Sequence, residues 1–150
     1  MNIADSSKYK KSKISYIGGG TFSANAAWMV AGHSTISYLR KNRISLYSKI
    51  NKLGDIARKQ IAKVFDGNVT TTGMGSLSMT HFRKNGISEI TNATHAAKCD
   101  SKLLHRYHFD MMANNGIFFL PGKLGAISNV HTNSDIKNMI KASTRFSENI

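Results

Sequence analysis

The sequence is poor in cysteine, proline and acidic residues, and it has no long apolar run. Its one cysteine, Cys99, excludes an internal disulfide and makes a reducing cytoplasm the expected location. No apolar stretch approaches the roughly 20 residues that a membrane helix needs. Residues 1–13 are polar and lack an apolar centre, which argues against a secretory signal peptide. We therefore expect no membrane association.

Basic residues far outnumber acidic ones. The 150 residues include 21 Lys and Arg against 8 Asp and Glu, a formal net charge of +13, and 41% of them are hydrophobic. That hydrophobic fraction suits one folded domain with its own core. A strong positive charge attracts nucleic acid or an acidic partner. The basic cluster lies within residues 8–13 and no nucleic-acid-binding motif occurs, so we favour a solvated surface or an acidic partner chain over a nucleic-acid groove.

Apolar residues recur at helical spacing in four segments and at strand-like spacing in four short ones. In the second helix, Tyr47, Ile50 and Leu53 are expected to face inward. Thr132 and Asp135 are expected to cap the last helix. Residues 87–98 show no clear pattern. The expected helices cover residues 23–39, 47–64, 100–114 and the segment after Thr132, and the expected strands cover residues 68–72, 76–82, 117–120 and 126–130.

This order of elements favours an α+β fold. We expect a small antiparallel sheet of three to four strands with helices packed on one face, preceded by a long N-terminal helical segment. Residues 1–13 are interpreted as a flexible basic lead and residues 14–150 as one small domain.

A glycine run leads into the first expected helix. Gly18, Gly19 and Gly20 precede Thr21, and small residues follow as far as Gly32. Backbone N–H groups and the positive end of the helix dipole converge at such a turn, which suits a phosphate. The segment resembles the G-T-x-S-G-N-P-x-x-M-A-A-G segment of class III pyridoxal-phosphate aminotransferases, in the branch that includes glutamate-1-semialdehyde aminomutase.

Two further segments resemble the same family, in the family's order. Residues 73–79 are similar to its Gly-Ser-Met-Phe strand. Residues 109–143 are similar to its C-terminal end, where a helix, a proline loop and a strand lead into Ala-His-Thr, and His131 stands at the histidine of that motif. The resemblance covers residues 14–147. It implies the C-terminal small domain of a fold-type I pyridoxal-phosphate enzyme.

The resemblance implies a binding role for Gly20 and Thr21. In the family, the threonine of the first motif donates hydrogen bonds to the cofactor phosphate of the neighbouring subunit. Thr21, with Gly20 beside it, would then contact pyridoxal 5'-phosphate across a homodimer. The alternative is that Thr21 only caps the helix that begins near Ser23. No catalytic residue and no metal ligand is assigned.

The sequence also departs from the family. The family's Gly-Asn-Pro is Ala24-Asn25-Ala26 here, without the proline that presets a helix start. Gly125 stands near the position of a loop glutamate of the aminomutase branch. The arginine that grips the substrate carboxylate in other class III enzymes has no counterpart in residues 123–130. The resemblance therefore implies no particular substrate.

The largest departure concerns the lysine that forms a Schiff base with the cofactor. In the family this lysine lies upstream of the glycine–threonine motif. The lysines of residues 8–13 lie in a polar lead that would not lower their pKa. The resemblance thus implies that this chain alone is not catalytic and holds no cofactor by itself. It would be a piece cut from a longer protein, a separately encoded subunit that docks a large-domain chain, or a gene remnant.

The remaining reactive residues form no recognised motif. His105 and His108 are three apart on an expected helix, but no cysteine pair or His-Glu-x-x-His pattern joins them. We interpret the histidines as surface or partly buried residues, and Cys99 as an inert thiol. The glycine run does not complete G-x-G-x-x-G, since Ser23 takes the third glycine position.

The first helix carries more apolar residues than one small core needs. Phe22, Trp28 and Met29 lie within or beside it. We expect an isolated copy to hide them by self-association, most simply as a dimer. A separate large-domain chain is the alternative partner, and a basic nucleic-acid binder is the alternative function.

Overall fold

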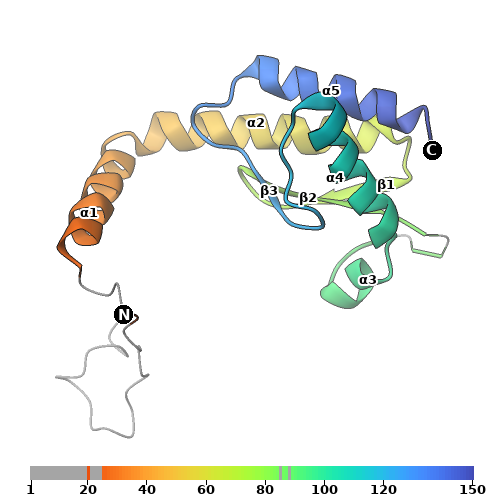
Figure 1. Ribbon diagram of the computed structural model, residues 1–150, viewed down its shortest axis with the longest axis horizontal. Coiled ribbons are helices and arrows are strands. Elements are labelled where there is room, and N and C mark those ends of the chain that lie inside the picture. The colour runs from red at the N-terminus through yellow and green to blue at the C-terminus, as the bar shows by residue number, and fades with distance from the viewer. Residues whose placement is uncertain (1–19, 21–24, 85, 88) are drawn as a thin grey trace, which may run out of the picture. The chain divides into compact units, whose positions relative to one another are not determined.

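The computed structural model describes residues 20, 25–84, 86–87 and 89–150 (Figure 1). The chain divides between Asn42 and Arg43 into two compact units. Its elements follow in the order α1, α2, β1, β2, α3, α4, β3, α5. The predicted lead, residues 1–13, lies outside the described residues, so its separation from a domain of residues 14–150 stays a prediction.

In the first unit, the helix α1 spans Ala26–Lys41, and none of its side chains is buried. Asn25 caps it: the side-chain oxygen accepts hydrogen bonds from the backbone N–H groups of Ala27 at 3.0 Å and Trp28 at 3.4 Å. Asparagine is among the best N-cap residues, so it starts the helix without the family's proline. The alternative interpretation of Thr21 is that it caps this helix. Asn25 is the N-cap instead.

The second unit begins with α2, which spans Arg43–Val64. The prediction that Tyr47 faces inward is wrong, because its side chain is 45% exposed. Leu46 starts the buried series instead, and a spacing of four and then three residues keeps the series on one side of the helix. The helix ends before Gly67, as predicted, where the backbone takes a positive φ of 79°. The buried residues of α2 are Leu46, Ile50, Leu53, Gly54, Ala57 and Ile61.

The sheet has three antiparallel strands in the order β1-β2-β3. β1 spans Val69–Thr72 and β2 spans Leu77–Phe82, close to the predicted ranges. Their register pairs Val69 with Phe82 and Thr72 with Met79. β3 is only Gly125–Ala126, which pairs with Ser78 and Leu77.

Two predicted strands are wrong. Residues 117–120 form no strand: Pro121 follows with no N–H to offer a neighbouring strand, and the segment instead lies over α4. The strand predicted over residues 126–130 shrinks to β3. After the Ile127 N–H donates to the Ser76 carbonyl at 3.0 Å, the chain turns, and the His131 N–H donates back to the Ser128 carbonyl.

The helices α3, α4 and α5 complete the second unit (Figure 1). α3 spans Ala93–Ala97, within the segment that had no clear pattern. α4 spans Ser101–Asn115, with Asp100 as its N-cap and a left-handed Gly116 at its end. α5 spans Asn133–Ser147 and starts with the predicted capping box of Thr132 and Asp135. α2 and α5 lie side by side, α2 contacts β1 and β2, and α4 contacts α5 and β2.

An aromatic cluster fills the core between these helices and the sheet. Phe65, Phe82, Tyr107 and Phe146 are all buried and meet edge to face, with ring centroids 5.1–6.4 Å apart. Edge-to-face pairs add to the stabilisation that burial alone gives. A smaller cluster of Leu53, Ala57 and Ile136 joins α2 to α5. The predicted α+β class, with helices on one face of a small antiparallel sheet, is confirmed.

Candidate functional site

Of the two predicted phosphate-binding residues, the structure describes Gly20. It is exposed, and a Cβ placed on it would meet no atom within 4 Å. Thr21 lies outside the described residues. The open space beside this exposed glycine leaves room for a ligand. The contact of Gly20 and Thr21 with the cofactor stays a prediction.

The second family-like segment forms the turn between β1 and β2. Gly73 and Gly75 both take positive φ values, 139° and 59°, which glycine adopts without strain. The turn sits directly on α2 at Gly54, where any Cβ would collide with the Gly75 carbonyl oxygen. These glycines therefore allow two backbones to approach more closely than side chains would permit.

Arg58 of α2 holds the same turn in place, and sequence reasoning missed it. Its Nη1 donates to the carbonyl oxygens of Gly75 at 2.7 Å and Leu77 at 2.6 Å, and its Nη2 pairs with Asp55. The side chain is only 12% exposed. An arginine three residues after an aspartate on a helix looks like an ordinary surface pair. Nothing in the spacing shows that the guanidinium bends onto a distant turn.

The proline loop is fixed to α4 through His108. The imidazole of His108 is 2% exposed, and its Nδ1 accepts a hydrogen bond from the Gly122 N–H at 3.1 Å. Burial lowers the pKa of His108 from 6.5 to about 4, and nearby His105 adds to the effect. His108 is therefore neutral at physiological pH. The sequence left open whether Tyr107 or His108 faces inward, and the structure buries both.

The outer side of the proline loop is apolar and exposed. Phe118, Leu120 and Leu124 are exposed by 78%, 57% and 51%. Gly125, which stands near the position of the family's loop glutamate, pairs with β2 and brings no acidic group to the loop. The loop thus offers an apolar surface.

His131 closes the turn before α5. Its Nδ1 accepts from the Ser128 N–H at 3.0 Å and lies 2.9 Å from the Ser128 hydroxyl. The next residue, Thr132, accepts from the Asp135 N–H, while the Asp135 carboxylate accepts from the Thr132 N–H at 2.7 Å. The Thr132 hydroxyl also donates to the Asp135 carboxylate at 2.8 Å, and this bond, followed by the one from the Thr132 N–H, lowers the pKa of Asp135. His131 and the capping box set the junction between the sheet and α5.

The described part of the chain brings no three His, Cys, Asp or Glu side chains together as a metal site. Cys99 is buried, its Sγ lies 3.7 Å from the His95 carbonyl oxygen, and burial raises its pKa. A raised pKa keeps the thiol protonated and poorly nucleophilic. No helix in the described ranges is long and apolar enough to cross a bilayer.

Comparison with known proteins gives relatives among the glutamate-1-semialdehyde 2,1-aminomutases. The chain is 33% identical over 126 residues to glutamate-1-semialdehyde 2,1-aminomutase 2 of Lachnoclostridium phytofermentans, covering 81% of this chain. It is 35% identical over 126 residues to glutamate-1-semialdehyde 2,1-aminomutase 1 of Macrococcus caseolyticus, covering 82%. The chain is a relative of the glutamate-1-semialdehyde 2,1-aminomutases. It spans 28% of the length of either enzyme. No protein-family model matches it.

Solved structures give the same fold. A β-phenylalanine aminotransferase from Variovorax paradoxus superposes with a TM-score of 0.72 at 21% identity, over 94% of this chain and 32% of that one. An omega-transaminase from Sphaerobacter thermophilus gives 0.67 at 24% identity, over 89% and 30%. The predicted resemblance to the C-terminal small domain of class III aminotransferases, in the glutamate-1-semialdehyde aminomutase branch, is confirmed.

Proposed function

We propose that these 150 residues serve as the C-terminal small domain of a pyridoxal-phosphate-dependent aminotransferase or aminomutase. The observation that carries the proposal is the 33% identity with an aminomutase over 81% of this chain. The chain covers 28% of that enzyme, which fits a domain rather than a whole enzyme. Pyridoxal phosphate supplies an electron sink when bound.

In this proposal, Gly20 and Thr21 contact the cofactor phosphate of a neighbouring subunit. The backbone N–H of Gly20 and the hydroxyl of Thr21 are both hydrogen-bond donors that suit a phosphate. The exposure of Gly20 and the open space beside it leave room for such a ligand. The rest of the site, including the lysine, would come from another segment or another chain.

The 150 residues alone are then catalytically silent. Their partner is a second copy or a large-domain chain, and the assembly works in the cytoplasm. The apolar side chains exposed on α1 and on the proline loop support a partner, because water-exposed apolar surface favours association.

Two experiments test this function. The purified chain, given pyridoxal phosphate, amino acid and 2-oxo acid, is expected to show no turnover. Measurable turnover with no other chain present would disprove the proposal that the chain alone is inactive.

The second experiment uses a chimera, in which the chain replaces the corresponding segment of the Lachnoclostridium phytofermentans enzyme. In that chimera Thr21→Val is expected to weaken cofactor retention roughly tenfold, the effect of losing one hydrogen bond to a charged group. Thr21→Ser keeps the hydroxyl and should retain the cofactor; equal loss in both variants would exclude the phosphate contact.

A further inference from the structure

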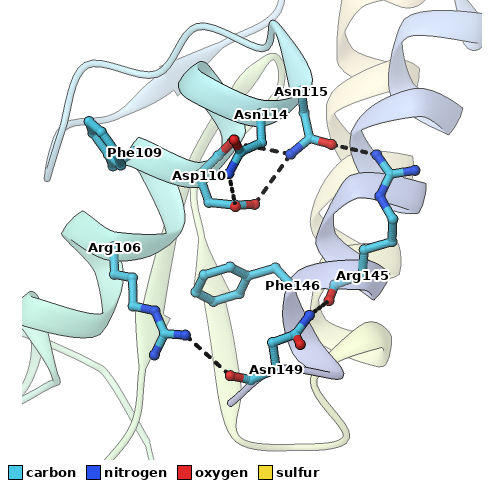
Figure 2. Close-up of a pocket in the computed structure, with 8 residues that line it drawn as sticks. All are labelled: Arg106, Phe109, Asp110, Asn114, Asn115, Arg145, Phe146 and Asn149. Atoms are coloured by element: carbon cyan, nitrogen blue, oxygen red, sulfur yellow. Dashed lines mark hydrogen bonds between the residues drawn. The ribbon is translucent and has the colours of Figure 1, made fainter.

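A polar pocket of about 590 Å³ lies between α4 and α5 (Figure 2). Most of its lining comes from α4, and Arg145, Phe146 and Asn149 line the other side. A second pocket of about 300 Å³ shares Asn114, Asn115 and Arg145 with it and adds Lys141. The first pocket is a groove open to solvent, and its volume lies in the range of small-molecule sites, about 300–1,000 Å³. Its lining residues are Arg106, Phe109, Asp110, Asn114, Asn115, Arg145, Phe146 and Asn149.

The one carboxylate that lines the pocket is already engaged by amides. The Asn114 Nδ2 donates to Asp110 Oδ1 at 2.7 Å, and the Asn115 Nδ2 donates to Asp110 Oδ2 at 3.2 Å (Figure 2). Both amides reach Asp110 from the same helix, at i+4 and i+5. These bonds orient the carboxylate but leave its charge, so Arg106, Arg145 and Asp110 together give the pocket a net charge of +1.

Two guanidinium groups line this pocket, and each is held in place by a neutral partner. Arg106 donates through Nη2 to the Asn149 carbonyl at 3.2 Å and lies over the Phe146 ring, 5.6 Å from its centroid. Arg145 donates through Nη2 to Asn115 Oδ1. In the part of the chain that the structure describes, neither forms an ion pair with a carboxylate. Each bond uses one of five guanidinium N–H groups, so most donors remain for a ligand.

We propose that this pocket binds a small organic dicarboxylate, with one carboxylate held by Arg106 and the other by Arg145. The planar fork of a guanidinium matches a carboxylate with two parallel hydrogen bonds. The neutral partners fix both side chains beforehand, which lowers the entropy lost on binding. Lys141, in the adjoining pocket, adds positive charge on the same side. This proposal uses neither Gly20 nor Thr21 and does not rest on the proposed function.

The test is an NMR titration of the 15N-labelled full chain with the series of dicarboxylates from succinate to pimelate. Acetate and inorganic phosphate are the comparison ligands. We expect one chain length to bind tightest, to shift the amide signals of the pocket residues, and to bind at least tenfold more tightly than acetate. Arg106→Gln and Arg145→Gln should each weaken that binding by about tenfold or more, as expected for a charge-assisted pair.

Lys137→Gln is the matched control, because it removes one positive charge from an exposed position of α5 outside both pockets. It should change the affinity by less than about twofold. Thermal unfolding checks that each variant folds, and Arg106→Lys, which keeps the charge but loses the fork, replaces Arg106→Gln if that variant does not fold. Equal weakening by Lys137→Gln, equal binding of acetate or phosphate, or shifts spread over the whole surface would overturn the proposal.

Discussion

The imidazole of His108 lies parallel to the ring of Phe119, with 6° between the planes and 4.8 Å between the centroids. Together with the hydrogen bond from the Gly122 N–H to Nδ1, this stack fixes both sides of Pro121 to α4. Because Nδ1 accepts a hydrogen bond, the neutral imidazole carries its proton on Nε2. Protonation at Nδ1 would break the bond to the loop.

Stability is therefore expected to fall in mildly acidic solution. The pKa of His108 is lowered to about 4 in the folded protein, against an ordinary 6.5. Between these values the unfolded chain binds a proton that the folded chain does not, so stability decreases as pH falls from about 6.5 to about 4. Above 6.5 the residue makes no pH-dependent contribution. The prediction is checked by measuring the midpoint of urea denaturation across this pH range and by NMR titration of the His108 ring.

The His108→Asn variant isolates this effect. The Oδ1 atom of the asparagine lies near the position of the His108 Nδ1 and can still accept a hydrogen bond from the Gly122 N–H. The asparagine side chain does not titrate. The variant loses the ring stack, worth about 1 kcal/mol, yet its midpoints should depend less on pH than those of the parent chain. Burial also lowers the pKa of His81, so some dependence remains. An unchanged slope, or a His108 pKa near 6.5, would contradict the prediction.

Replacement of Gly54 by alanine is expected to be strongly destabilising. The new methyl group would collide with the carbonyl oxygen of Gly75, and backbone cannot rotate away as a side chain can. The added strain should lower the free energy of unfolding by about 1–3 kcal/mol, measured by urea denaturation.

Gly32→Ala is the matched control. Gly32 is also inside a helix, α1, but a Cβ there would meet no atom within 4 Å. Alanine should raise the local helix stability by up to about 1 kcal/mol, seen in hydrogen exchange of the α1 amides. If both alanine variants behaved alike, the close approach of α2 and the Gly75 turn would not be the cause.

The Tyr107 hydroxyl and the Ser143 hydroxyl form a fully buried pair, 2.8 Å apart. Ser143→Ala leaves the phenol without this partner and should cost about 1–3 kcal/mol. Tyr107→Phe should cost less, because the Ser143 hydroxyl still donates to the Met139 carbonyl at 2.8 Å. A double-mutant cycle measures the interaction. Equal costs for the two single variants, with no interaction energy, would contradict this account.

The chain is expected to self-associate through α1. Trp28 and Met29 are 65% and 64% exposed. Trp28→Glu combined with Met29→Glu should shift sedimentation toward the monomer. Ser37→Glu is the control, because nine helical residues place Ser37 on the side opposite Trp28. A parent chain that stays monomeric at high concentration would refute the prediction.

Local signals in the sequence were enough for most of the fold. The capping box at Thr132, the glycine after Asn115 and the turn at Gly67 each mark an end of a helix by short-range chemistry. The β-branched residues of 68–72 and the alternation of residues 76–82 mark the central hairpin. These features act within a few residues, so spacing alone reveals them.

Long-range packing is what the sequence did not reveal. The sequence around Ile117 and Phe119 resembles a strand, yet the segment lies over α4. His108 holds it there, because its ring stacks on Phe119 and its Nδ1 accepts a hydrogen bond from the Gly122 N–H. The reach of Arg58 to Gly75 depends in the same way on a contact between elements. The binding role of Thr21 comes from family resemblance alone, and Thr21 lies outside the described ranges.

The seating of the β1–β2 turn on Gly54 has a consequence for the order of assembly. The partners of that contact lie within residues 51–77, so this half of the unit can form while the chain is still being synthesised. The second half of the core waits for α5, which covers Leu53 and Ala57 with Ile136. A polypeptide that ended before Asn133 would therefore be a partly folded intermediate with exposed apolar core residues, which chaperones and proteases recognise.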